Sequence, residues 1–143
     1  MNTERGIQGL TENRHDIIRY LWDTWSPAWS YSDEDYARSA PSFDNPDFVD
    51  ICVHSYRHRH VNAPGEERFL EVERRLAERP VISVPVIVLR AAQSGFGRPS
   101  SDPAGDQARF SDLRGRRIVE GAGHDLPAHR PDSVVDALLE LLA

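Results

Sequence analysis

The sequence lacks several features that would point to particular protein classes. It contains no lysine, so all 17 basic residues are arginine, and 23 acidic residues outnumber them to give a net charge of −6. A general nucleic-acid-binding protein needs a basic surface, so this charge balance argues against that class. No stretch approaches the roughly 18 consecutive apolar residues that a membrane-spanning helix needs. We therefore expect neither a nucleic-acid partner nor a membrane association.

Cysteine is almost absent, and a secretion signal is not visible. The one cysteine, Cys52, has no partner for an internal disulfide, which fits a reducing compartment. Residues 1–5 are polar and no apolar segment follows them, so the sequence shows no signal peptide. We therefore expect a cytoplasmic protein. Cys52 itself lies in an apolar helical stretch, which favours a packed thiol over a reactive nucleophile.

Helical periodicity dominates residues 1–79, which we interpret as a helical region. Apolar residues recur there at spacings of three and four, typical of helices with one buried face. Helices are expected at residues 12–25, from 33 to just before Pro41, at 46–60 and at 66–78. Thr11, Ser32 and Asn45 precede the first three helices and are suitable N-cap residues. The last helix is expected to bury its apolar side against a core.

The period changes at Pro80, and residues 80–143 have an α/β pattern. The expected elements are strands at 84–89 and 117–119, a short helix at 107–113 between them and a last helix from Pro131. The first strand is a continuous apolar run rich in β-branched residues, typical of a strand buried on both faces of a parallel sheet. The predicted fold class is therefore α/β, a helical front followed by a βαβα unit of a parallel sheet.

A sheet of only two parallel strands poses a packing problem. Such strands need helices above and below and further strands beside them. An unpaired strand edge tends to pair with another chain. We therefore expect the edge beside residues 84–89 to pair with a second copy of the chain or with a complementary N-terminal half. A non-catalytic interaction module of this kind is one hypothesis for the function.

A histidine follows the second expected strand. His124 lies on a glycine-containing loop, Gly121-Ala122-Gly123, just past the strand's C-terminal end. Such a side chain is free of the sheet and can point into the crevice that forms there. An imidazole titrates near neutral pH, so it can serve as a general base. The alternative is a loop histidine that only hydrogen-bonds nearby backbone.

The segment around His124 resembles a known family. Residues 121–131, Gly-Ala-Gly-His-Asp-Leu-Pro-Ala-His-Arg-Pro, stand before an apolar terminal helix and resemble the catalytic-histidine segment of α/β-hydrolases. Residues 84–89 resemble the penultimate strand of that family, and the helices before Pro80 resemble the cap of its dehalogenase-like and epoxide-hydrolase-like branches. The resemblance implies a partial α/β-hydrolase fold: a cap-like region at 1–79 and a C-terminal part of the core at 80–143.

The same resemblance implies chemistry and also its limits. It assigns His124 as general base in the hydrolysis of a small apolar ester, epoxide or halide. The family's nucleophile elbow, Gly-x-Ser-x-Gly or its Asp and Cys forms, is absent here. Ser94 stands where the family's acid is expected, which leaves Asp102 or Asp106 as substitutes, or an acid outside this chain. We expect no turnover from this chain alone.

The histidine-rich stretch at 54–60 is a candidate metal site. His54 and His58 are four residues apart on one helix face and could bind zinc as a pair. A zinc site needs a third and usually a fourth ligand, and no suitable partner motif occurs. We therefore expect no metal and no cofactor.

Three further residues are candidates for contact with a small-molecule substrate. Tyr56 and His54 could donate hydrogen bonds to it if their helix covers the active site. Trp25, in an aromatic group with Trp22 and Trp29, could line an apolar pocket. The alternative for this aromatic group is packing between helices.

Overall fold

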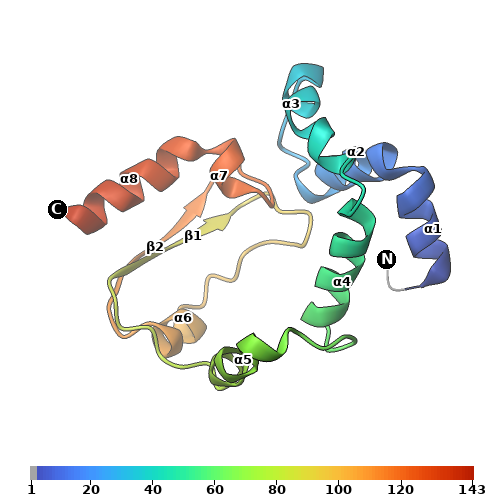
Figure 1. The fold of residues 1–143 in the computed structure, drawn as a ribbon. Helices are drawn as coiled ribbons and strands as arrows, with labels where there is room; N and C mark the ends of the chain where they lie inside the picture. Colours follow the sequence, from blue (N-terminus) through green and yellow to red (C-terminus); the bar gives the residue numbers. More distant parts are fainter. Residues whose placement is uncertain (1–2) are drawn as a thin grey trace. The chain divides into compact units, whose positions relative to one another are not determined.

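The structure, a computed structural model, describes residues 3–143 and combines helices with one small parallel sheet (Figure 1). This composition is consistent with a partial α/β fold. The chain divides into two compact units. Unit 1 contains the residues up to Leu21 together with Tyr31–Glu73, and unit 2 contains Trp22–Ser30 together with Arg74–Ala143. Residues 22–30 thus pack with the α/β part of the chain, although they lie among helices in the sequence.

Unit 1 is helical. Its elements are α1 (Glu4–Glu12), the first part of α2 (Arg14–Trp25), α3 (Asp33–Phe43), α4 (Phe48–Arg59), the 3-10 turn η1 (Glu67–Phe69) and the start of α5 (Leu70–Ala77). A small core forms where α1 meets α4, from Leu10, Val49 and Val53. Cys52 packs against this core, and burial raises the pKa of its thiol. The prediction of a packed thiol is confirmed.

The starts of the helices in unit 1 show which of the predicted N-cap residues are correct. Ser32 caps α3 as predicted, in a reciprocal pair of hydrogen bonds with Asp35. Thr11 is not an N-cap: it lies inside α1, where its hydroxyl donates to the carbonyl of Ile7 at 2.9 Å. α1 was missed, and Thr3 caps it by accepting the N–H of Gly6. In both Thr3 and Ser32, a polar side chain reaches a free N–H of the first turn.

Two predicted boundaries near prolines are wrong. α3 continues through Pro41 to Phe43, and the N–H of Asp44 donates to the carbonyl of Pro41 at 3.3 Å, so a proline in the last turn does not end this helix. α4 begins at Phe48 rather than at residue 46. Asn45 accepts the N–H of Asp47 at 2.9 Å, so its side chain closes a turn before the helix.

Unit 2 contains the sheet. Its elements are β1 (Val86–Ala91), α6 (Ala104–Arg109), β2 (Leu113–Val119), α7 (Leu126–His129) and α8 (Pro131–Leu142), with the end of α5. β1 and β2 run parallel, as the apolar run predicted (Figure 1). Ala91 pairs with Val119 at the C-terminal end of the two strands. Val119, Ala122 and Leu126 form its core. The order of strand, helix, strand and helix is confirmed, with α7 as an addition.

Neither the sheet nor α5 is covered as fully as predicted. All six residues of β1 are only half-buried, because two strands and short helices cannot cover both faces. The apolar side of the 66–78 segment was expected to be buried, but Val72 is 51% and Leu76 59% exposed. Large apolar side chains are also exposed on β2 and α8. Among residues 3–143, no helix has the length and apolar character needed to cross a membrane.

Candidate active site around His124

The loops that follow the two strands lie together, because the strands are parallel. Ser94 follows β1 and His124 follows β2, and both residues line one hollow of about 290 Å³. Leu89 and Ala91 of β1 also line it. The sequence predicted that a crevice would form at this edge of the sheet and that His124 would face it. The structure brings His124 and Ser94 to the same hollow.

A third segment, the end of α2, joins the two loops. The backbone carbonyl of Trp25 accepts the N–H of Gly95 at 3.0 Å and the N–H of His124 at 3.1 Å. One carbonyl oxygen has two lone pairs, so it can hold both donors at once. Residues 93–97 and 121–124 are therefore tied to each other through Trp25. The backbone of His124 is held from outside its own loop.

Two glycines allow this close approach. A Cβ on Gly123 would lie 2.5 Å from the Cα of Ser26, and a Cβ on Gly95 would lie 2.0 Å from the carbonyl oxygen of Thr24. Real Cβ atoms do not come so close to backbone atoms. Gly95 and Gly123 are thus needed where residues 24–26 pass between the loops. This gives the glycine before His124 a packing role that its place in the motif does not reveal.

Gln93 is a further connection that the sequence analysis missed. Its N–H donates to the carbonyl of Ala122 at 2.9 Å, and its side-chain oxygen accepts the N–H of Gly121 at 2.7 Å. Its side-chain NH₂ donates to the carboxylate of Glu120 at 2.7 Å. One glutamine thus holds three successive positions of the histidine loop. A polar residue directly after β1 was the only sequence signal for it.

The imidazole of His124 lies against two aromatic rings. Its centroid is 5.2 Å from that of Trp25, edge to face, and 4.8 Å from that of Phe96. His124 is exposed, and within residues 3–143 its ring makes no side-chain hydrogen bond. The aromatic rings limit how the imidazole can turn and leave its nitrogens available. Such a group can take a proton from a donor that enters the hollow.

The two candidate acids are engaged elsewhere. Asp102 accepts the N–H of Ala104 at 2.9 Å, at the start of α6. Asp106 is buried and pairs with Arg90 at 2.6 Å and with Arg116 at 2.7 Å. The hydrogen bonds from these two guanidinium groups hold the pKa of Asp106 below its ordinary value. Neither carboxylate lines the hollow that contains His124.

The remaining predicted site residues lie in unit 1. His54 is exposed and Tyr56 half-buried on α4, and their hydrogen bonds to a substrate stay predictions. The ring of His54 stacks on that of His58, whose Nε2 is 3.1 Å from a carboxylate oxygen of Glu73. Within residues 3–143, no cluster of three or more histidine, cysteine or acidic side chains is arranged to hold a metal ion.

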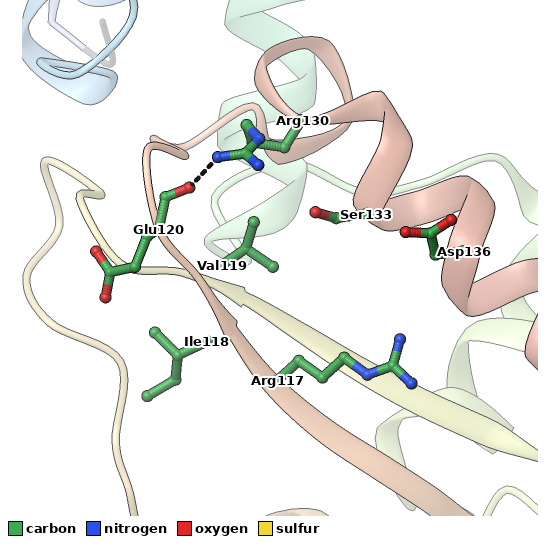
Figure 2. Close-up of a pocket in the computed structure, with 7 residues that line it drawn as sticks. All are labelled: Arg117, Ile118, Val119, Glu120, Arg130, Ser133 and Asp136. Atoms are coloured by element: carbon green, nitrogen blue, oxygen red, sulfur yellow. Dashed lines mark hydrogen bonds between the residues drawn. The ribbon is translucent and has the colours of Figure 1, made fainter.

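A second hollow, of about 300 Å³, lies between β2 and α8. Figure 2 shows Ser133 and Asp136 on the helix side and Arg117 and Val119 on the strand side. Arg130 donates to the carbonyl of Glu120 at 2.7 Å, and Arg117 pairs with Glu140 of α8. Both guanidinium groups already have partners, so these contacts fasten the histidine loop and α8 to the strand.

Comparison with known proteins gives one informative similarity. No protein-family model matches the chain, and no curated protein matches it either. Among solved structures, it is similar to a protein described as a putative epoxide hydrolase from Klebsiella pneumoniae subsp. pneumoniae MGH 78578. The two share 35% identity with a TM-score of 0.87, over 98% of this chain and 46% of the other. This similarity supports a hydrolase-like relation.

The coverage is unequal. The chain spans less than half of the length of the Klebsiella pneumoniae protein. The likeness extends over nearly all of this chain, so it includes both units and the histidine loop.

Proposed function

We propose that this chain carries the general base of a hydrolase, His124, and that its substrate is a small apolar ester, epoxide or halide. The observation that carries the proposal is the position of His124. Its imidazole stands at the C-terminal edge of a parallel sheet, in a hollow, on a backbone held by Trp25. The similarity to a protein described as an epoxide hydrolase supports the reaction class.

In the proposed reaction, a free nitrogen of the His124 imidazole removes a proton from water, which attacks either the substrate itself or a covalent intermediate on a nucleophile that this chain does not supply. The water oxygen then forms a bond to an electrophilic carbon, and the bond from that carbon to the leaving oxygen or halide breaks. The imidazolium returns its proton to solvent or to the leaving oxygen. Trp25 and Phe96 present apolar surface beside the imidazole, which suits an apolar substrate.

The proposal also includes a requirement for further groups. A Gly-x-Ser-x-Gly motif, or its Asp or Cys form, does not occur in these 143 residues. No carboxylate within residues 3–143 hydrogen-bonds the His124 ring to stabilise the imidazolium. A lone imidazole lacks both the nucleophile and the oxyanion donors that supply most of the rate. The purified chain alone should therefore not hydrolyse p-nitrophenyl acetate above background.

A chimera tests the role of His124. This chain replaces the matched part of the Klebsiella pneumoniae protein, provided that the parent protein hydrolyses an epoxide such as styrene oxide. The chimera should retain hydrolysis, and His124→Ala should reduce kcat by about 100-fold or more, as expected for loss of a general base. The control is His60→Ala, which removes an exposed histidine of unit 1.

Two results would contradict the proposal. The first is a folded chimera that does not hydrolyse the epoxide although its parent does. The second is a His124→Ala chimera as active as the unsubstituted one. A third result would change the proposal in part. If the chain alone hydrolyses p-nitrophenyl acetate and His124→Ala abolishes this activity, His124 remains the proposed general base, but the requirement for further groups is wrong.

A second candidate function is an interaction module. Ile118 of β2 is 52% exposed, and Leu138 and Leu139 of α8 are 55% and 61% exposed. Apolar surface of this kind, next to a sheet with unpaired edges, favours association with another copy or with a complementary half. Size-exclusion chromatography with light scattering tests this candidate. A stable monomer with a cooperative thermal transition would argue against it.

A further inference from the structure

A second histidine, His129, lies directly behind the His124 loop. The Nδ1 atom of His129 accepts the N–H of Gly123 at 2.8 Å. This bond holds the Ala122–Gly123 peptide unit, which directly precedes the Gly123–His124 unit. In the sequence, His129 is only one residue of the segment that resembles the family's histidine loop.

The contact requires one protonation state of His129. An imidazole nitrogen that accepts an N–H has no proton of its own, so the ring is neutral with its proton on Nε2. Burial lowers the pKa of His129, while the Asp125 carboxylate on the same loop acts in the opposite direction. From the segment 22–30, the Trp29 ring stacks on the His129 ring with the two centroids 4.6 Å apart. This indole carries no charge. The neutral form is therefore the one that this environment favours.

The fold directs His129 toward Gly123. α7 is a single turn, closed by the carbonyl of Asp125, which accepts the N–H groups of Ala128 and His129 at 3.1 and 3.2 Å. This turn brings residue 129 back to residue 123. The Nε2 atom of His129 is buried and has no hydrogen-bond partner within residues 3–143, so the ring is held by Trp29 and by the Gly123 bond.

Two adjacent N–H groups thus hold the backbone at the proposed base. Gly123 donates to the His129 ring, and His124 donates to the Trp25 carbonyl. Gly123 also packs on Ser26 without room for a Cβ. Two successive peptide units held in this way fix the position of the backbone from which the His124 imidazole extends.

We propose that His129 is a positioning residue: as a neutral hydrogen-bond acceptor for Gly123, it holds His124 in its working orientation. The inference rests on the proposed role of His124 as general base. It predicts that the acceptor nitrogen matters, and not only the ring that fills the space beside Trp29.

Two substitutions separate these effects. His129→Phe keeps a ring to stack on Trp29 and removes the acceptor. His129→Asn loses the ring but places its side-chain oxygen near the position of Nδ1. In the ¹⁵N-labelled full chain, hydrogen exchange at Gly123 should accelerate by roughly 2- to 12-fold in His129→Phe, the range for loss of one hydrogen bond. The His124 ring signals should shift in the same variant, and His129→Asn should restore both.

The unsubstituted chain supplies a measurement that does not depend on the folding of a variant. The ¹⁵N shifts of His129 should identify Nδ1 as the unprotonated nitrogen at neutral pH. When acid protonates the ring, Nδ1 becomes a donor and the Gly123 amide loses its acceptor. The Gly123 amide signal should therefore titrate with the same midpoint as the His129 ring.

Several results would overturn the inference: a proton on Nδ1 at neutral pH, a Gly123 amide that does not follow the His129 titration, unchanged Gly123 exchange in His129→Phe, or no restoration by His129→Asn. In the active chimera, His129→Phe should lower kcat with little change in KM. If His124→Ala leaves that hydrolysis intact, the proposed function fails, while the NMR results still decide whether His129 positions residue 124.

Discussion

The backbone carbonyl of Trp25 accepts the N–H of His124 at 3.1 Å, and the two side-chain rings meet edge to face with centroids 5.2 Å apart. These residues are 99 positions apart in the sequence. The end of a helix in the first quarter of the chain therefore determines both the backbone position and the ring environment of a histidine near its end. The same carbonyl also holds Gly95, so three separated segments meet at one oxygen atom.

This convergence predicts that Gly123→Ala destabilises the chain. The new Cβ would lie 2.5 Å from the Cα of Ser26, so the loop or residues 24–26 must shift. Overpacking of this kind costs about 1–3 kcal/mol in the free energy of unfolding. Urea denaturation measures it. The control is Gly105→Ala in α6, where a new Cβ meets no atom within 4 Å. This substitution should increase the free energy of unfolding by at most about 1 kcal/mol. Equal effects at the two glycines would contradict this account.

The ion pairs of Asp106 should stabilise unit 2. Asp106→Asn leaves Arg90 and Arg116 without their carboxylate and should lower the melting temperature by roughly 5 °C or more. The exposed pair of Arg117 with Glu140 provides the control, since Glu140→Gln should have a much smaller effect. Because the pKa of Asp106 is lowered in the folded state, its contribution is present above its ordinary value of 3.8 and is lost as the pH falls toward the folded value.

His15 should stabilise unit 1 in a similar way. Its Nδ1 is 2.8 Å from the hydroxyl of the buried Tyr36, and its Nε2 is 2.9 Å from a carboxylate oxygen of Asp44. His15→Ala removes both bonds and should reduce the free energy of unfolding by about 1–3 kcal/mol. His60→Ala, at an exposed position, should leave the free energy of unfolding unchanged. A His15→Ala variant with unchanged stability would mean that these bonds are replaced by water without cost.

His129 should make stability depend on pH. Its pKa is lowered in the folded chain, so below the ordinary value of 6.5 the unfolded chain binds a proton that the folded chain does not. This contribution is therefore complete above pH 6.5 and is lost as the pH falls toward the folded pKa. The free energy of unfolding, measured by denaturation at several pH values, should change less with pH in His129→Asn than in the unsubstituted chain. The same pH dependence in both would exclude His129 as its source.

A substitution on the exposed face of α8 distinguishes an effect on stability from an effect on self-association. Leu139→Gln should change the free energy of unfolding by less than about 0.5 kcal/mol, because Leu139 is 61% exposed. If the chain self-associates through this face, the same substitution should raise the dissociation constant about tenfold, measured by light scattering. Leu126→Ala provides the contrast: this leucine is 8% exposed, and its loss should cost about 2–5 kcal/mol.

Much of the fold follows from local patterns. The apolar run ending at Leu89 predicted a parallel strand, Ser32 predicted the start of α3, and Pro131 predicted the start of α8. The place of His124 after the second strand was also predictable. Each of these signals acts between residues a few positions apart, and backbone conformation responds to such neighbours directly.

Two of the wrong predictions depend on structure that the local pattern does not contain. Thr11 has the side chain of a cap, but whether it caps or bonds back to Ile7 depends on where the helix begins. The burial of Val72 and Leu76 depends on whether another element covers them, and their own helical spacing does not decide it.

By itself, the sequence determined that the chain is α/β, that its strands are parallel and that an ionisable imidazole stands where the second strand ends. Only the tertiary structure decided how the loop that carries this imidazole is held: by the carbonyl of Trp25, by Gln93 and by the ring of His129. The physical reason is that a hydrogen bond depends on distance and direction in space. Residues 25, 93 and 124 acquire both only when the chain folds and the glycines at 95 and 123 let the backbones meet.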